Sequence, residues 1–242
     1  MTYVVVGATA GLGRALSERL AASGHPLVLA ASDQRDLNVV AAHLRLQHGI
    51  EVETVAFDGT AEPPIEEIRE AVGDSPIAAV LMPIGVSSAA DDGTLVGDPL
   101  RRLLKVNFTL VAELSAALLP DLLTQGFGSI VGFGSVAAVR GRTRNVAYAA
   151  AKRGLRSYFE SLVCVTHSSP VEVQFYELGY IATQQAFGKR LVPRPVPPER
   201  VADIVARNLG RGSFIRRYPP YWNAAAVAIR LLPATVFRRL GA

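Results

Sequence analysis

Short apolar runs alternate with stretches of helical periodicity along the first 180 residues of the chain. Apolar runs of four to six residues bounded by turn residues are typical of buried strands. They occur at Tyr3–Val6, Leu27–Ala31, Val52–Phe57, Ile77–Met82, Ser129–Phe133 and Val171–Tyr176. Between them, apolar residues three and four positions apart predict helices. These helices are expected at Arg14–Ala22, Leu37–Leu46, Ile65–Val72, Leu100–Leu123 and Tyr148–Val165.

The regular alternation of strand and helix with short connections predicts an α/β fold. Such a pattern is typical of a single-domain, doubly wound parallel sheet with helices on both faces. Segment Leu100–Leu123 is apolar on more than one face, as expected of a helix buried on two sides. A proline-rich stretch, Pro193–Pro198, precedes a last predicted helix at Glu199–Leu209. We therefore expect residues 1–212 to form one domain, followed by a tail of residues 213–242.

Composition adds limits to this picture. Half of the residues are hydrophobic and 19% are charged, which suffices for a sizeable core and argues against disorder. The single cysteine, Cys164, cannot form an internal disulfide, lies in an apolar run and is expected to be buried. A reducing cytoplasm is the simplest compartment. We expect no metal site, because the four histidines and one cysteine show no ligand spacing.

Two further absences and one asymmetry bear on location. No signal peptide is expected, since no basic segment precedes an apolar stretch at the start. No spanning helix is expected either, because no run of 18 or more apolar residues lacks a charge. Residues 1–188 carry 14 basic and 19 acidic side chains, whereas residues 189–242 carry 11 and 2. The chain is thus a mildly acidic body with a basic tail.

Residues 218–242 of this tail combine aromatic and apolar residues with Arg230, Arg238 and Arg239. Such a segment could lie on an anionic bilayer surface as a peripheral contact. Alternatively, it forms a helix that packs on its own domain or on a sister subunit. Nucleic-acid binding is not expected, because the aromatics and arginines form no strand-tracking groove motif.

A glycine-rich loop follows the first predicted strand, with the spacing Gly7-x-x-x-Gly11-x-Gly13. Backbone N–H groups and the positive end of a helix bind phosphate, and side chains at these positions would block the approach. A plain tight turn between strand and helix would need glycines too. The position of this loop, directly before the first helix, favours a phosphate site.

Three polar residues in the second half form a candidate catalytic group. Tyr148 and Lys152 are four residues apart and therefore share one helix face, and Ser135 precedes the tyrosine by 13 residues. A free tyrosine has a pKa of about 10, and a nearby positive charge lowers it. We therefore expect the ammonium of Lys152, together with a positively charged cofactor ring, to lower the pKa of Tyr148 and fit it for general acid–base work on an alcohol or carbonyl.

The order and spacing of these motifs, over residues 3 to about 210, resemble the short-chain dehydrogenase/reductase family. The resemblance implies a Rossmann-like, NAD(P)-binding fold, with residues 1–212 as the dinucleotide-binding and catalytic domain. The catalytic residues that it implies are Asn107, Ser135, Tyr148 and Lys152. The cofactor-binding residues that it implies are Gly7, Thr9, Ala10, Gly11, Leu12, Gly13, Ser32, Asp58, Gly85, Tyr148, Lys152, Gly179, Ile181 and Thr183.

The chain departs from the family pattern after the fourth strand. Met82-Pro83-Ile84-Gly85 stands where the family usually has Asn-Asn-Ala-Gly, and Leu178-Gly179 replaces Pro-Gly. The first change puts the geometry of that loop in question. Neither change removes a group that transfers a proton.

The end of the second strand bears on the choice of cofactor. NAD-preferring members carry an acidic residue there that accepts the ribose hydroxyls, and this chain has Ala31 followed by Ser32. We therefore favour NADP(H), with NAD(H) as the alternative. Arg14 and Arg35 could reach a 2′-phosphate or be solvated, and Asp33 could accept a ribose if the strand ends later.

The resemblance implies an oxidoreductase that transfers a hydride between the cofactor and a carbonyl or secondary alcohol. A cofactor-binding regulatory protein and a redox epimerase or isomerase remain as alternatives. The substrate pocket is expected between residues 87–92, 136–144 and 181–195, with a medium-sized apolar ketone or alcohol as the default substrate. The arginines of this frame could be solvated or could face an anionic substrate or acyl carrier: Arg140, Arg142 and Arg144.

Two long helices have apolar faces that favour pairing between subunits. These faces lie in Asn107–Leu123 and Leu155–Val165. We expect a homodimer or homotetramer on this basis. The expected location is cytoplasmic, with surface contact to a membrane through residues 218–242 as the further hypothesis.

Overall fold

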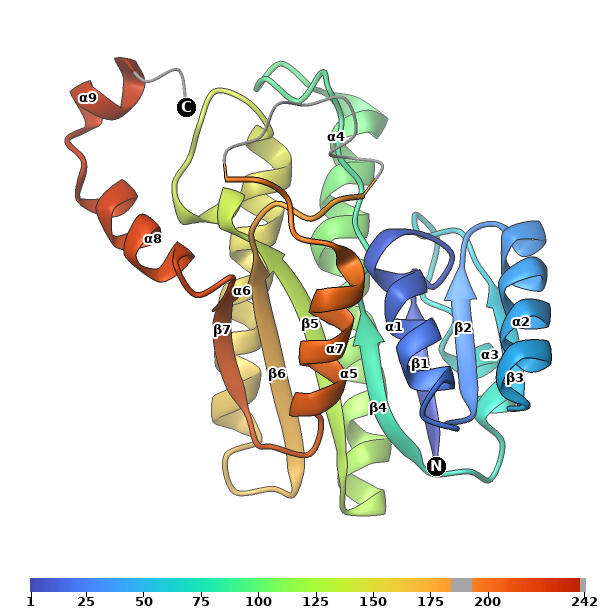
Figure 1. The fold of residues 1–242 in the computed structure, drawn as a ribbon. Helices are drawn as coiled ribbons and strands as arrows, with labels where there is room; N and C mark the ends of the chain where they lie inside the picture. Colours follow the sequence, from blue (N-terminus) through green and yellow to red (C-terminus); the bar gives the residue numbers. More distant parts are fainter. Residues whose placement is uncertain (184–192, 240–242) are drawn as a thin grey trace.

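The computed structural model describes residues 1–183 and 193–239 of the chain. Within these residues, seven strands form one parallel sheet in the order β3-β2-β1-β4-β5-β6-β7 (Figure 1). The strands are β1 (Thr2–Val6), β2 (Leu27–Ala31), β3 (Val52–Ala56), β4 (Ile77–Met82), β5 (Gly128–Ser135), β6 (Val171–Leu178) and β7 (Phe214–Tyr218). The chain moves outward from β1 to β3 and then crosses back to β4, so the strand order reverses between β1 and β4. This confirms the predicted doubly wound α/β fold.

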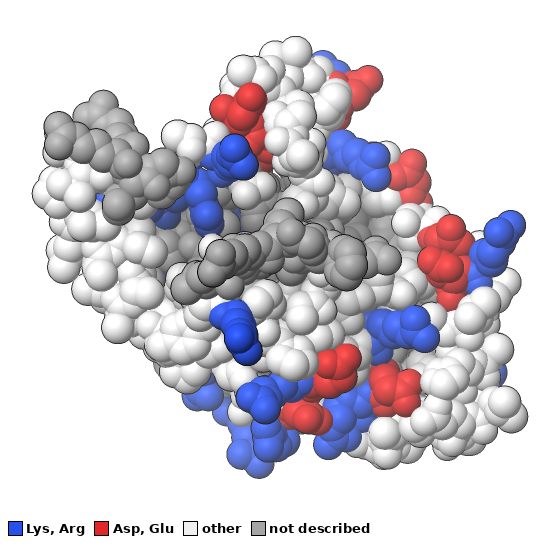
Figure 2. All heavy atoms as spheres, turned by 45° about the horizontal axis from the view of Figure 1, so that its top comes forward, with Lys and Arg blue, Asp and Glu red and all other residues white. Residues whose placement is uncertain are grey.

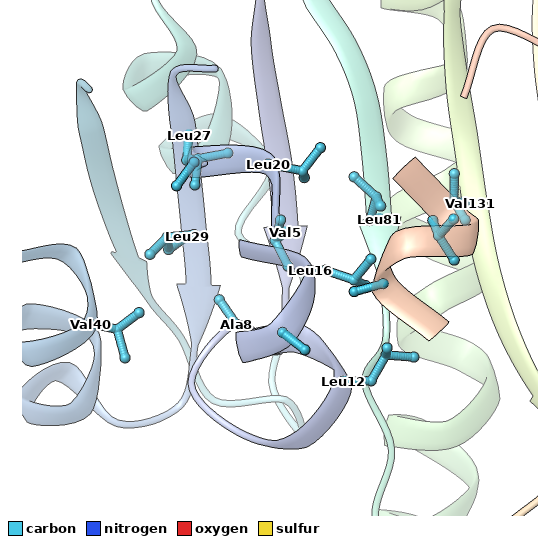
Figure 3. Packing of buried hydrophobic residues seen from close by; sticks show 14 of the residues in the cluster. Val5, Ala8, Leu12, Leu16, Leu20, Leu27, Leu29, Val40, Leu81 and Val131 are labelled. Carbon is cyan, nitrogen blue, oxygen red and sulfur yellow. The ribbon is translucent and has the colours of Figure 1, made fainter. Parts of the chain in front are cut away.

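Helices cover both faces of the sheet and bury two separate apolar clusters. One cluster lies under α1 (Gly11–Ala21), α2 (Gln34–His48) and α7 (Pro198–Asn208). The other lies under α3 (Ile65–Val72), α5 (Leu110–Gln125) and α6 (Val146–Val165). Figure 3 shows the first cluster, where leucines of α1 such as Leu16 lie beside Val5, Leu81 and Val131 of the strands. Apolar side chains on both faces of every central strand explain the continuous apolar runs of the sequence.

Most predicted elements are confirmed, and β2, α3 and β4 have the predicted bounds. The edge strand β7 was not predicted. Its sequence, Phe-Ile-Arg-Arg-Tyr, has two adjacent charges, and within the described residues it pairs with β6 alone. Arg217 is mostly buried in an ion pair with Glu177 of β6, a partner that local patterning does not reveal. Because β7 joins the sheet, residues 214–218 of the predicted tail belong to the same sheet as strands β1 to β6.

The long helix predicted at Leu100–Leu123 has three parts. Helix α4 (Gly97–Leu104) continues through a π-helical turn, η1 (Lys105–Thr109), into α5. By length and composition, residues 97–125 could cross a membrane, and half of the most apolar window is buried. Leu110, Leu114 and Leu118 are fully buried in the second cluster, so in this fold the segment is a core helix.

The C-terminal tail packs on its own domain, which was one of the predicted alternatives. Helix α8 (Trp222–Leu231) buries Trp222 and Ala226 against the 3₁₀ helix η2 (Val136–Val139). Arg140 donates hydrogen bonds to the main-chain oxygens of Ile229 and Leu232 near the end of α8. A short helix, α9 (Ala234–Arg239), follows.

The outer face of α8 stays exposed. Tyr221, Val227 and Leu231 on this face are 48%, 57% and 77% exposed. In the view of Figure 2, the visible surface at the lower left is mostly uncharged, although α8 also carries the exposed Arg230. Contact of this face with a bilayer stays a prediction.

The prediction for Cys164 was wrong, since its side chain is exposed. The buried face of α6 runs through Leu155, Phe159 and Leu162. At 100° per residue, position 164 lies away from that face. An apolar run in the sequence therefore did not indicate burial here.

Candidate active site

A cavity of about 610 Å³ opens at the carboxyl edge of the sheet, where the strand order reverses. Figure 2 looks toward this edge, with basic and acidic side chains scattered around its rim. Every predicted cofactor-binding residue except Gly13 lines the cavity. Three of the four predicted catalytic residues line it too, and these are Ser135, Tyr148 and Lys152. Of the predicted substrate frame, residues 184–192 lie outside the described part of the chain.

The glycine-rich loop forms one end of this cavity. Gly7 has a φ of 91°, in the region that favours glycine. The N-cap residue of α1, Ala10, offers no side-chain cap, so the first N–H groups of this helix keep their capacity for an anion. A Cβ on Gly13 would lie 1.9 Å from the carbonyl oxygen of Gly7, so this glycine permits close packing of α1 on β1. The loop therefore fits the phosphates of a dinucleotide, and Gly13 supports it from behind.

The predicted triplet converges at the other end of the cavity. Tyr148 and Ser135 are hydrogen-bonded through their side chains, and Ser135 Oγ also accepts from the N–H of Ala137 at 3.1 Å. Lys152, one turn after the tyrosine on α6, is only 4% exposed. A phenol, a hydroxyl and an ammonium thus share one cavity with the glycine-rich loop.

The groups of the chain itself do not produce the lowered pKa of Tyr148 that was predicted from Lys152 and a positively charged cofactor ring together. Burial is the largest cause and raises the pKa of Tyr148 above its usual value of 10.0. The hydrogen bond from Ser135 and the positive charge of Arg142 oppose this shift, and Lys152 is not among its causes. Spacing on a helix places two side chains on one face, but the surroundings decide which effect on the pKa is larger.

Lys152 is held by main-chain oxygens. Its Nζ donates to the carbonyl oxygens of Ile84 and Phe133, each at 3.1 Å. Burial lowers the pKa of Lys152 from 10.5 to about 8. The ammonium therefore ties the ends of β4 and β5 together beneath the site, at an electrostatic cost.

This cost should make stability depend on pH. Because the pKa of Lys152 is about 8 when folded and 10.5 when free, the unfolded chain binds more protons between these values, and stability rises with pH there. Between about pH 8 and pH 10, we expect the wild type to gain about 2 kcal/mol relative to Lys152→Met, at about 1.4 kcal/mol per pKa unit. Urea unfolding of both proteins at both pH values measures this gain. A constant difference between the two would contradict it.

Asn107 lies behind the cavity and does not line it. Its amide is fully buried in the π-helical turn and donates to the carbonyl oxygens of Val86, at 2.8 Å, and Leu103, at 2.9 Å. Its Oδ1 accepts from the N–H of Val86 at 3.2 Å. A Cβ on Gly85 would lie 2.9 Å from this Oδ1 and 3.4 Å from Lys152 Nζ. Asn107 and Lys152 therefore hold the loop after β4, although this loop lacks the usual asparagines.

Another part of the cavity wall carries the residues expected to contact the adenosine half of a bound dinucleotide. Asp58 Oδ1 accepts from the N–H and the hydroxyl of Thr60, each at 2.8 Å, and these bonds lower the pKa of the carboxyl. Ala31 and Ser32 line the cavity at the end of β2. Asp33 instead caps α2 by accepting from the N–H of Asp36 at 3.0 Å. The carboxylate that could have bound a ribose therefore has another partner.

The structure assigns the three loop arginines to different places. Arg140 holds α8, Arg144 is exposed, and Arg142 lines the cavity next to Tyr148. Arg102, on α4, lines the cavity as well and lowers the pKa of Asp58. Sequence reasoning missed Arg102 altogether and could not separate the other three, because all of them look like solvated charges in the sequence.

Comparison with known proteins agrees with this geometry. The family model described as short chain dehydrogenase matches residues 1–190. An uncharacterized oxidoreductase of Mycobacterium tuberculosis is 32% identical over 243 residues, covering 98% of this chain and 96% of that protein. The very-long-chain 3-oxoacyl-CoA reductase of Bos taurus is 25% identical, over 94% of this chain and 74% of that one.

A solved structure extends the likeness to the fold. The short-chain dehydrogenase from Sphingobium yanoikuyae in complex with NADPH superposes with a TM-score of 0.82 at 25% identity. The match covers 95% of this chain and 93% of that one. Sequence, sheet topology and cavity thus lead to one conclusion: the chain belongs to the short-chain dehydrogenase/reductase family of NAD(P)-dependent oxidoreductases.

Proposed function

We propose that the chain interconverts a carbonyl and a secondary alcohol by hydride transfer, with NADP(H) as the preferred cofactor. The observation that carries this proposal is the shared cavity. Its one end has an uncapped helix start behind a glycine loop, and its other end has the hydrogen-bonded pair of Tyr148 and Ser135 above Lys152. The N–H groups at the helix start can bind the phosphates of a dinucleotide. The Tyr148–Ser135 pair can transfer a proton to or from a carbonyl oxygen.

A bound nicotinamide cofactor supplies or accepts the hydride. In reduction, the phenol proton of Tyr148 moves to the carbonyl oxygen of the substrate, and in oxidation the phenolate takes it back. Ser135 turns its hydroxyl proton from the phenol to the substrate oxygen and stabilises the charge that develops there. Lys152 holds the carbonyl oxygens of Ile84 and Phe133 at the base of the site, one helical turn after the tyrosine.

A panel of ketones and alcohols with NADPH and NADH, followed at 340 nm, tests this function. We expect reduction of at least one ketone class with NADPH. Cofactor binding without any turnover would instead support the regulatory alternative. Conversion of a chiral alcohol without net change at 340 nm would support an epimerase.

The substrate class follows from the side chains at the reaction end. The default is a medium-sized apolar ketone. Arg142 favours a second class, a ketone that also carries an anionic group, because its half-buried guanidinium lies in the cavity beside Tyr148. Two relatives are named very-long-chain 3-oxoacyl-CoA reductase and 3-oxoacyl-[acyl-carrier-protein] reductase. A keto acid and its methyl ester in the panel separate the two classes.

The end of β2 supports NADP(H) as the preferred cofactor. Replacing Ala31, which lines the cavity, with Asp should weaken NADPH binding by about 10- to 100-fold, since like charges opposed across a contact cost several kcal/mol at most. The matched control is Ala31→Asn, because an asparagine side chain has nearly the size of an aspartate but carries no charge. Fluorescence titration with NADPH and NADH measures both affinities. Equal loss in the two variants would show that size, and not charge, matters.

The assembly and location of the enzyme remain proposals. We propose a homo-oligomer that pairs through the outer surfaces of the long helices. Leu104 on α4, Leu123 on α5 and Val165 on α6 are exposed large apolar residues there. A cytoplasmic location, with a peripheral membrane contact through α8 and the residues after it, completes the proposal.

A further inference from the structure

Asp91 is a buried carboxylate in the segment that follows β4. The residue as a whole is only 2% exposed. Oδ1 accepts from the N–H of Ala147 at 2.9 Å, and Oδ2 accepts from the N–H of Tyr148 at 3.0 Å. Its main-chain oxygen accepts from the N–H of Val146 at 3.4 Å. A buried carboxylate is stable only with such partners, and here all three belong to the first turn of α6.

Helix α6 needs a distant cap because it has no local one. The residue at its N-cap position, Asn145, has a φ of 57° and makes no side-chain capping bond. The first N–H groups of a helix have no partner within the helix. Asp91, 57 residues before Tyr148 in the chain, supplies both acceptor oxygens. One of the two N–H groups held in this way belongs to the candidate catalytic tyrosine itself.

We propose that Asp91 is a positioning residue for Tyr148. This inference rests on the proposed role of Tyr148 in proton transfer. The carboxylate fixes the main chain from which the phenol extends, and it does so from the loop whose residues Val86 and Ser87 line the cavity. The catalytic helix and this wall of the cavity are thereby joined at one point. Loss of the bond should let the phenol move relative to the substrate oxygen.

The neighbouring residue, Asp92, provides a matched control. The sequence placed it at the end of the substrate frame, but it does not line the cavity. It is exposed, and its carboxylate accepts from the N–H and the hydroxyl of Thr94, at 3.0 and 2.7 Å. The hydrogen bonds of the Asp92 carboxylate therefore stabilise a turn within the same loop, whereas those of Asp91 hold α6. Replacing either aspartate removes one carboxylate from the loop, but only Asp91 bonds to the tyrosine.

The test compares Asp91→Ala, Asp91→Asn and Asp92→Ala with the wild type, using NADPH and the panel ketone that the wild type reduces fastest. Misplacement of a reacting group by about 1 Å can cost on the order of 100-fold in rate. We expect kcat of Asp91→Ala to fall about 10- to 100-fold, with the NADPH dissociation constant within about twofold of wild type. Its solvent deuterium isotope effect on kcat should rise, because proton transfer becomes slower. Asp92→Ala should behave as wild type.

Asp91→Asn should recover part of the rate, since its amide oxygen can still accept one of the two N–H bonds. The Asn variant also carries the comparison if Asp91→Ala fails to fold. Full activity of both Asp91 variants would overturn the proposal. So would a loss of NADPH affinity in proportion to kcat, which would indicate a general structural role.

Amide hydrogen exchange gives a readout that does not depend on activity. The amides of residues 146–148 should exchange faster in Asp91→Ala than in Asp92→Ala, with the remaining core unchanged. If the wild type reduces no ketone, the proposed function fails, whereas faster exchange confined to these amides still supports the capping contact. Unchanged exchange at these amides would overturn that contact as well.

Discussion

Replacing Tyr148 with Phe should lower kcat about a thousandfold or more while NADPH still binds with nearly wild-type affinity. General acid–base catalysis by a positioned side chain contributes about 10²- to 10⁴-fold, and the substitution removes only the hydroxyl. The ring still fills the same space at the start of α6, so the cavity and the glycine-rich loop are kept. Steady-state reduction followed at 340 nm and fluorescence titration with NADPH measure the two quantities.

Tyr158→Phe is the matched control for this variant. Tyr158 lies on the same helix, ten residues on, and its hydroxyl donates to the carbonyl oxygen of Ala112 at 3.1 Å, away from the cavity. The same chemical change at this position should cost some stability and leave kcat almost unchanged. A fully active Tyr148→Phe enzyme would contradict the proposed role of Tyr148 in proton transfer. An equal loss of rate in both variants would point to a general effect of losing a buried hydroxyl.

Replacing Gly13 with Ala should destabilise the fold by about 3 kcal/mol and weaken NADPH binding at the same time. The new Cβ would lie 1.9 Å from the carbonyl oxygen and 2.7 Å from the carbonyl carbon of Gly7. Both are main-chain atoms that no rotamer change can move, so α1 must shift away from β1. Overpacking of a well-packed core costs about 1–3 kcal/mol, and a clash with main chain lies at the upper end of that range. The shift also displaces the N–H groups at the start of α1.

Gly154→Ala is the control for the effect of an added methyl group. Gly154 lies within α6, and a Cβ there would meet only the ring of Phe108, at 3.7 Å, an ordinary contact. Alanine favours a helix over glycine by about 1 kcal/mol, so this variant should unfold at a higher urea concentration than the wild type. Urea unfolding and NADPH titration of both variants check the pair. A Gly13→Ala protein as stable as the wild type would show that α1 is not packed as closely as described.

The sequence determined those features that depend on neighbours along the chain. The apolar runs at Leu27–Ala31 and Ile77–Met82 gave strands with the predicted bounds, because a strand buried on both faces needs an uninterrupted apolar run. The spacing of Gly7, Gly11 and Gly13 predicted the glycine-rich loop at the start of the first helix, because this loop too depends on neighbouring residues in the chain. The four-residue step from Tyr148 to Lys152 put both side chains into one cavity, since a helix repeats every 3.6 residues.

Tertiary structure alone decided everything that depends on contacts between distant segments. Strand β7 forms through hydrogen bonds with β6, whereas its two adjacent arginines interrupt the apolar pattern that would have predicted a strand. Only the folded structure distinguishes Arg140, which is hydrogen-bonded to α8, from Arg142, which lines the cavity. The pKa of Tyr148 moved upward because burial outweighs nearby charge, and burial is a property of the folded chain. The cap that Asp91 places on α6 joins residues 57 positions apart, so no local pattern could encode it.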